Sequence, residues 1–104
     1  MSIDSPDPIE ESPTAIKHNS YYDGKVQSLG FSRENNDATV GVLEPGEYDF
    51  GRASRRETIK VVHGTLHHIP TNRDFSESQV LTVEPGEEIK LSCAEHVAYV
   101  CYYG

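Results

Sequence analysis

The chain has 104 residues and a formal charge of −8, from 17 acidic and 9 basic side chains. This length suits one domain, and the negative charge argues against binding to nucleic acid or to an anionic membrane surface. The chain holds no apolar run long enough to span a bilayer and does not begin like a secretory signal, so we expect a cytoplasmic location.

The first 19 residues differ in composition from the rest. Residues 1–19 contain three of the six prolines and four acids against one lysine, with almost no hydrophobic periodicity. Such a composition is typical of a flexible arm. We therefore expect an acidic N-terminal arm over residues 1–19 and one folded domain over residues 20–104.

From residue 21 the pattern changes to short runs of β-branched and aromatic residues separated by turn residues. The alternation predicts eight strands, at residues 25–31, 38–43, 47–50, 58–62, 65–69, 79–83, 87–91 and 97–103. Residues 70–77 are a polar connection. No segment shows an apolar stripe of helical length, so the sequence predicts an all-β domain, a small barrel or jelly roll.

Two kinds of turn are predicted between these strands. Glu-Pro-Gly-Glu occurs at residues 44–47 and again at 84–87, which indicates two similar β-units that each begin with the same turn. His63-Gly64 predicts a tight hairpin that returns the chain into residues 65–69, because glycine tolerates a positive φ. Cys93 and Cys101 are expected to be free thiols.

The stretch from residue 46 to residue 64 reads GEYDFGRASRRETIKVVHG. A glycine, then Glu57 and a second glycine at Gly64, is similar to the framework of a cupin metal motif. Arg52 and Ser54 stand where that motif has its two metal-binding histidines. The resemblance implies a cupin-like β-barrel, a double-stranded β-helix, whose usual metal ligands are missing.

A longer set of motifs resembles the small cupins of the pyrimidine/purine nucleoside phosphorylase family. The matching pieces are YYDGKVQSLGF at residues 21–31, TVGV at 39–42, GEYxF at 46–50, and Glu57 followed by GTL at 64–66. This resemblance implies a compact barrel that pairs as a homodimer. It also implies phosphorolysis of purine and pyrimidine nucleosides to free base and ribose 1-phosphate, with inorganic phosphate as co-substrate and no cofactor.

Phosphorolysis requires that the protein bind phosphate close to the anomeric carbon and bind the ribose while positive charge develops on its ring. It must also stabilise the negative charge of the departing base. Arg52, Arg55 and Arg56 concentrate positive charge in this acidic chain, and guanidinium groups suit phosphate oxygens. Arg55 and Arg56 are neighbours, so at most one of them is expected to enter a pocket from a strand. We expect Arg52 and one of these two arginines to hold the phosphate. The plainer alternative is that these arginines balance nearby acids.

Glu57 is the candidate catalytic residue, because a carboxylate can accept ribose hydroxyl hydrogen bonds and face an oxocarbenium-like centre. An ion pair with Arg52 or Arg56 is its alternative. Tyr48 could present its ring to a sugar or base, or belong to the core. One of His67 and His68 could contact the base, and the choice between them stays open.

Two other functions remain open at this stage. The histidines, with Glu57, could form the metal site of a metal-dependent cupin, although His67 and His68 face opposite ways on a strand. The barrel could also bind a small anion without turning it over. Pairing of two copies is physically reasonable if residues 25–31 form an exposed strand edge.

Overall fold

A computed structural model describes residues 16–33 and 36–104 of the chain. They form ten strands, and none of the described residues belongs to a helix that could cross a membrane. The strands are β1 (Lys17–Tyr21), β2 (Val26–Arg33), β3 (Asn36–Leu43), β4 (Gly46–Arg52), β5 (Glu57–His63), β6 (Leu66–His68), β7 (Arg73–Phe75), β8 (Val80–Val83), β9 (Glu88–Cys93) and β10 (Val97–Tyr103).

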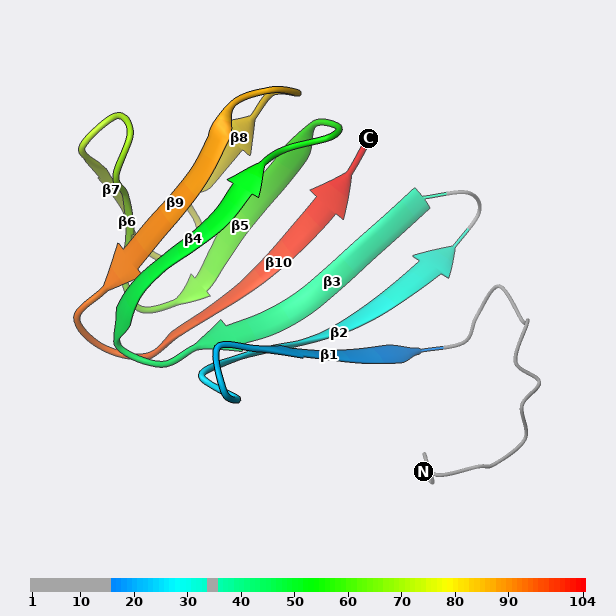
Figure 1. The fold of residues 1–104 in the computed structure, drawn as a ribbon, viewed down its shortest axis with the longest axis horizontal. Coiled ribbons are helices and arrows are strands. Elements are labelled where there is room, and N and C mark those ends of the chain that lie inside the picture. Colours follow the sequence, from blue (N-terminus) through cyan, green and yellow to red (C-terminus); the bar gives the residue numbers. More distant parts are fainter. Residues whose placement is uncertain (1–15, 34–35) are drawn as a thin grey trace.

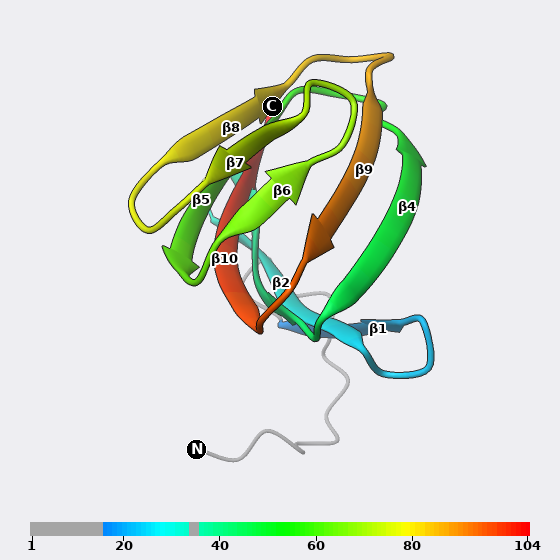
Figure 2. The ribbon, with the colours of Figure 1, turned by 90° about the vertical axis from the view of Figure 1, so that its left-hand side faces the viewer.

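The strands form two antiparallel sheets (Figure 1). The larger sheet has the order β1-β2-β3-β10-β5-β8, and the smaller has the order β4-β9-β6-β7. Figure 2 shows β4 and β9 facing β5 and β10 across the interior of the molecule. The predicted all-β class is therefore confirmed.

The two Glu-Pro-Gly-Glu turns have equivalent places in this fold. The first carries the chain from β3 to β4 and the second from β8 to β9, so each leads from the larger sheet into the smaller one. β4 and β9 then pair as neighbours. The prediction of two β-units with a shared opening turn agrees with this arrangement.

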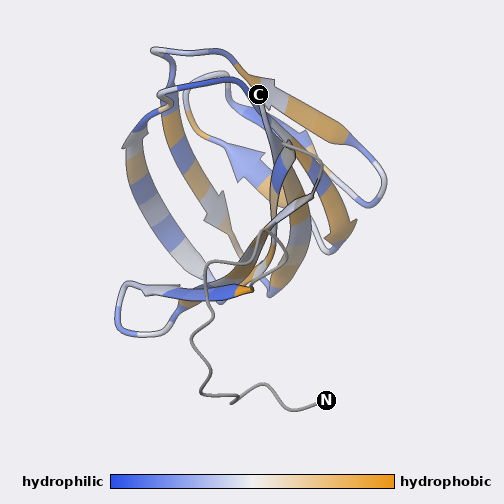
Figure 3. Cartoon of the chain, turned by 90° about the vertical axis from the view of Figure 1, so that its right-hand side faces the viewer, coloured by the Kyte–Doolittle hydropathy of each residue, from blue (hydrophilic) through white to orange (hydrophobic). Residues whose placement is uncertain are grey.

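Alternating side chains build the core between the sheets. Along β9 and β8, every second residue is buried, and Figure 3 shows the matching apolar and polar bands along the strands. Fully buried side chains come from both sheets and include Val26, Leu43, Val61, Leu66 and Val83. Cys93 and Cys101 are buried free thiols, as expected.

All eight predicted strands are present, and two short strands were missed. β7 lies within the segment that was expected to be a polar connection, and β1 covers Lys17–Tyr21. Lys17, His18 and Asn19 therefore pair with β2 and do not belong to an arm. Residues 1–15 of the predicted arm lie outside the described residues.

Two predictions about strand neighbours are wrong. β5 and β6 do not form a hairpin across Gly64, because β5 pairs with β10 and β8 while β6 pairs with β7 and β9. β2 does not offer an exposed edge either, since β1 pairs along it from Val26 to Gly30 and β3 covers its other side. In both places the chain finds a partner that is distant in sequence or was not recognised as a strand.

Gly64 is required for a different reason from the glycine of an ordinary turn. Its φ is 88°, and a Cβ atom there would lie 2.6 Å from the backbone oxygen of His96. Gly86 has almost the same φ, 89°, but its Cβ position is open. Comparing Gly64 with Gly86 therefore separates the free-energy cost of a positive φ from the cost of a steric clash of the Cβ atom.

We predict that Gly86→Ala lowers the free energy of unfolding by about 1–2 kcal/mol, the usual cost of a left-handed backbone for an L-residue. Gly64→Ala should cost about 1–3 kcal/mol more, because the backbone of His96 must move. Urea unfolding of the two variants measures the difference, and equal losses would contradict this role for Gly64.

Candidate active site

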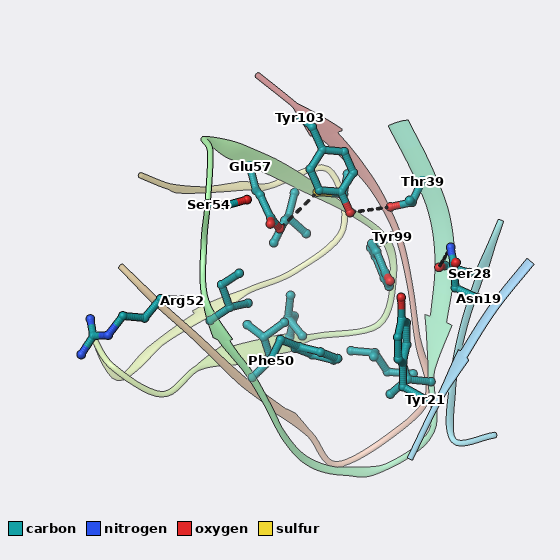
Figure 4. Close-up of a pocket in the computed structure, with 17 residues that line it drawn as sticks. Asn19, Tyr21, Ser28, Thr39, Phe50, Arg52, Ser54, Glu57, Tyr99 and Tyr103 are labelled. Atoms are coloured by element: carbon teal, nitrogen blue, oxygen red, sulfur yellow. Dashed lines mark hydrogen bonds between the residues drawn. The ribbon is translucent and has the colours of Figure 1, made fainter. Parts of the chain in front are cut away.

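A cavity of about 320 Å³ lies between the two sheets. Apolar side chains from both sheets form much of its wall, namely Val26, Leu43, Ile59, Leu66, Ile89 and Leu91. Four aromatic residues also line it, namely Tyr21, Phe50, Tyr99 and Tyr103. The polar lining consists of Asn19, Ser28, Thr39, Arg52, Ser54 and Glu57, several of which appear in Figure 4. A carboxylate thus shares a partly open cavity with aromatic rings and apolar side chains.

Glu57 is the first residue of β5, opposite Tyr103 of β10 and Val83 of β8. Its side chain is half-buried in the cavity, and the thiol of Cys101 donates a hydrogen bond to its Oε1 at 3.7 Å. Burial raises the pKa of the Glu57 carboxyl, while the Cys101 hydrogen bond and the charge of Arg55 act against that rise. Cys101 stays a thiol, because burial and the nearby carboxylate raise its pKa to about 12.

Arg52 and Ser54, which replace the two cupin histidines, both line the cavity. The guanidinium of Arg52, however, points away from its centre (Figure 4), donates to the Gly86 carbonyl at 2.8 Å and lies 3.8 Å from Glu88. The cause is an irregularity in β4, where Asp49 pairs with Lys90 but Arg52 pairs with Glu88. Such a bulge adds one residue and changes the face to which the following side chain points.

The structure brings neither Arg55 nor Arg56 into the cavity, which corrects the expectation that one of them enters it. Both precede β5 in a loop, so the alternation of a strand does not apply to them. Arg56 pairs with Glu84 at 3.1 Å. Arg55 pairs with Asp37, lowering the pKa of that carboxyl, and lies 5.1 Å over the ring of Tyr103. Arg55 therefore approaches the cavity behind a side chain that lines it.

Tyr48 belongs to the core and does not line the cavity. Its hydroxyl donates to the carbonyl of Glu44 at 2.7 Å, and its ring packs against Tyr22 and Phe50, at 5.0 Å and 6.2 Å between centroids. Tyr48 and Phe50 alternate along β4 and so lie on the same face of the strand. Only Phe50, nearer the cavity, reaches its lining.

The two histidines also lie outside the cavity. His67 is on the outer face of the smaller sheet, where its Nδ1 is 2.7 Å from a carboxylate oxygen of Asp74. His68 points inward, but its Nδ1 is 2.6 Å from the hydroxyl of Thr71, beside a separate depression that Arg73 also lines. Neither of the two histidines that were expected to contact the base therefore lines this cavity.

Several lining residues were not found from the sequence. Ser28 and Thr39 are polar residues on the inward faces of β2 and β3, and Tyr99 and Tyr103 alternate with outward residues on β10. This alternation was visible and could have marked them. Asn19 was assigned to the arm, so no pattern pointed to it.

Within residues 16–33 and 36–104, no three histidine, cysteine, aspartate or glutamate side chains gather closely enough to hold a metal ion. The charged groups that line the cavity are Glu57 and Arg52. The arrangement can accept hydrogen bonds at a desolvated carboxylate, present aromatic faces to a flat ring and exchange hydrogen bonds with several hydroxyls.

Comparison with known structures supports the fold class. An RmlC-like cupin protein from Ralstonia eutropha has a TM-score of 0.70 at 10% identity, over 86% of this chain and 64% of that one. A protein of unknown function from Vibrio parahaemolyticus has a TM-score of 0.77 at 35% identity, over 86% of this chain and 98% of that one. The protein is a cupin-type barrel.

Sequence comparison identifies the family more closely. The family model described as pyrimidine/purine nucleoside phosphorylase matches residues 16–103. A protein of that name from Magnetococcus marinus is 39% identical over 93 residues, which are 86% of this chain and 99% of the relative. The chain belongs to the pyrimidine/purine nucleoside phosphorylase family.

Burial of Glu57 predicts a pH dependence of stability. Because its folded-state pKa lies above the ordinary value of 4.5, the folded protein keeps a proton that the unfolded chain loses just above that pH. The stabilisation is complete below this window and is lost as the pH rises through the folded-state pKa. Glu57→Gln should abolish this component.

The measurement is urea unfolding of wild type and Glu57→Gln from about pH 4 to about pH 8. The wild-type free energy of unfolding should fall relative to that of Glu57→Gln as the pH rises. Parallel curves for the two proteins would show that burial does not shift the pKa of this carboxyl.

Proposed function

We propose that this protein catalyses phosphorolysis of purine and pyrimidine nucleosides to free base and ribose 1-phosphate. The observation that carries the proposal is the half-buried carboxylate of Glu57 inside an aromatic cavity of a chain of this family. The cavity supplies a hydrogen-bond acceptor for a sugar and flat apolar surfaces for a base. It also excludes water from part of the space around the reacting carbon.

In this proposal Glu57 accepts hydrogen bonds from ribose hydroxyls. As the bond between C1′ and the base lengthens, positive charge grows on the sugar ring, and a fixed carboxylate in a poorly solvated site stabilises that charge. The raised pKa of Glu57 means that the ionised form is lost at a higher pH than for an exposed glutamate. Activity is therefore expected to fall as the pH decreases through that pKa.

Arg52 is the arginine assigned to the phosphate, because it lines the cavity while Arg55 and Arg56 do not. Its guanidinium is exposed and bound to the Gly86 carbonyl, so it can turn to a phosphate by exchanging one acceptor for another. Arg55 acts from behind the Tyr103 ring as a long-range positive charge.

The chemical step balances without a further co-reactant. An oxygen of hydrogen phosphate forms a bond to C1′ while the glycosidic C–N bond breaks and its electron pair goes to the base nitrogen. The proton of hydrogen phosphate passes to the base, which leaves neutral. The assigned residues position the reactants and stabilise charge, and no covalent enzyme intermediate forms.

The primary test incubates chelator-treated protein with a panel of nucleosides, with and without inorganic phosphate, and measures free base and ribose 1-phosphate. Phosphate-dependent release after chelation is the expected result. Activity that requires an added metal would favour the metal-dependent cupin. Binding without release from any nucleoside would favour the non-catalytic, ligand-binding module.

Replacing Glu57 tests its assigned role. We expect Glu57→Gln to lower turnover at least about tenfold, which corresponds to about 1.4 kcal/mol of transition-state stabilisation, because the amide carries no charge to face the sugar. The barrel should remain folded in this variant. Glu95→Gln, at an exposed position in the turn before β10, is the control and should keep the wild-type rate. Wild-type turnover in Glu57→Gln would remove Glu57 from the site.

We also propose that two copies pair through the outer face of the larger sheet. Apolar residues that are each at least 37% exposed lie on this face, among them Leu29, Phe31, Val40, Val42, Val80 and Tyr102. Strand pairing places Leu29 beside Val40. Exposed apolar surface of this extent is typical of an interface.

We further propose a cytoplasmic location, with which the buried free thiols are compatible.

Val40→Glu is expected to convert a dimer into a monomer, because association would bury an unpaired charge at the centre of the face. Ala94→Glu, in the exposed turn between β9 and β10, should leave the mass unchanged. Light scattering after gel filtration measures both variants. A Val40→Glu protein with the wild-type dimer mass would place the interface elsewhere.

A further inference from the structure

One row of residues crosses four neighbouring strands of the larger sheet at the same register. Asn19 of β1 pairs with Ser28 of β2, Ser28 pairs with Gly41 of β3, and Gly41 pairs with Tyr99 of β10. Asn19, Ser28 and Tyr99 all line the cavity, as Figure 4 shows. We refer to these four residues as the cross-strand row.

Gly41 provides space within this row. A Cβ atom on Gly41 would lie 2.5 Å from the hydroxyl oxygen of Tyr99 and 2.6 Å from its Cζ. These distances are too short for any side chain, so the phenol ring of Tyr99 lies across the backbone of β3 at this point. The absence of a side chain at Gly41 lets Tyr99 reach from β10 over β3 towards β2.

The hydroxyl at the end of this ring lies near two other polar side chains of the row. Ser28 is close enough to the phenol of Tyr99 to oppose the rise of its pKa, and Asn19 Nδ2 donates to Ser28 Oγ at 3.2 Å. Burial raises the pKa of Tyr99 to about 12, so the phenol keeps its proton at neutral pH. The row therefore presents two hydroxyls and a carboxamide, all uncharged, at the wall of the cavity.

From this arrangement we infer that the cross-strand row binds the polar edge of the nucleobase, with the ribose directed to Glu57. The inference rests on the proposed function and assigns the base-binding end of the same cavity. Figure 4 shows Asn19 and Ser28 on the β1–β2 side, away from Glu57 and Ser54. The ring of Tyr21 lies next to Tyr99, and the ring of Phe50 lies farther across the cavity. A base that stacks against these rings directs its edge to the row.

The chemistry of the row suits a base better than a phosphate. Its uncharged groups cannot compensate a dianion, whereas each hydroxyl both donates and accepts, and the carboxamide offers an acceptor oxygen while its nitrogen binds Ser28. Base edges combine carbonyl and amino or imino groups. Reorientable hydroxyls can match either kind, so this row explains how one site accepts both purines and pyrimidines.

The experiment measures two ligands on one set of variants. Calorimetry gives the dissociation constants of uracil and hypoxanthine on one side and of ribose 1-phosphate on the other. Tyr99→Phe, which keeps the ring and removes the hydroxyl, should weaken binding of both bases about tenfold and leave ribose 1-phosphate unchanged. Ser92→Ala, which removes a hydroxyl from the outward face of β9, away from the cavity, is the control and should change neither constant.

Two further variants test the same contact independently, so that the conclusion does not depend on one variant that fails to fold. Ser28→Ala should reproduce the base-specific loss, and Gly41→Ala should do the same by displacing the Tyr99 ring. Combining Gly41→Ala with Tyr99→Phe should add little to either single loss, because both remove the same hydroxyl contact. If Gly41→Ala fails to fold, Tyr99→Phe and Ser28→Ala still decide the question.

The outcomes separate this inference from the proposed function. Wild-type phosphorolysis with unchanged base binding in Tyr99→Phe and Ser28→Ala would overturn the inference alone. Equal weakening of base and ribose 1-phosphate would also overturn it, because the row would then shape the whole cavity. The third outcome is a base-specific loss of binding in the two variants together with a wild-type protein that turns over no nucleoside. It would support base binding by the row and would reject phosphorolysis.

Discussion

Glu57 holds a carboxylate inside a barrel whose interior is otherwise mostly apolar, and the chemistry assigned to the cavity depends on that placement. Burial raises its pKa, while the Cys101 thiol and the Arg55 charge keep the ionised form accessible. The same desolvation that costs stability strengthens the interaction of the carboxylate with a developing positive charge. Burial of the Glu57 carboxylate therefore lowers the free energy of unfolding and raises its proposed contribution to catalysis. The stability of the protein and its activity depend on the same feature.

Most of the polar side chains in the cavity come from the larger sheet, whose neighbouring strands place different polar groups side by side. β10 alone contributes Tyr99, Cys101 and Tyr103 on its inward face, and each contacts a different partner. Tyr103 binds Thr39 on β3, Cys101 binds Glu57 on β5, and Tyr99 crosses Gly41 towards Ser28. The position of β10 between β3 and β5 thus connects the proposed sugar end to the proposed base end.

The strands were predictable because inward and outward residues alternate and turn residues separate them, and Glu57 was found from its spacing to two glycines. Side-chain depth was not predictable. Tyr48 and Phe50 share a face, yet only Phe50 reaches the cavity, because alternation specifies a face but not a height along the barrel. Arg52 points away because a bulge adds one residue to β4. β1 was missed because its five residues have no apolar alternation, and only pairing with β2 makes them a strand.

Arginine and serine have a direct chemical consequence at the two positions that resemble the histidine positions of a cupin metal motif. A guanidinium offers donors and no lone pair, so Arg52 cannot ligate a cation, and the hydroxyl of Ser54 is a weak ligand by itself. What the framework retains is the start of β5, which keeps Glu57 facing the interior opposite Tyr103. In the proposed reaction the positive charge that this carboxylate faces is therefore the transient charge of the sugar ring. A cupin barrel can keep its inward glutamate for that purpose after its metal ligands have been replaced by a group suited to an anion.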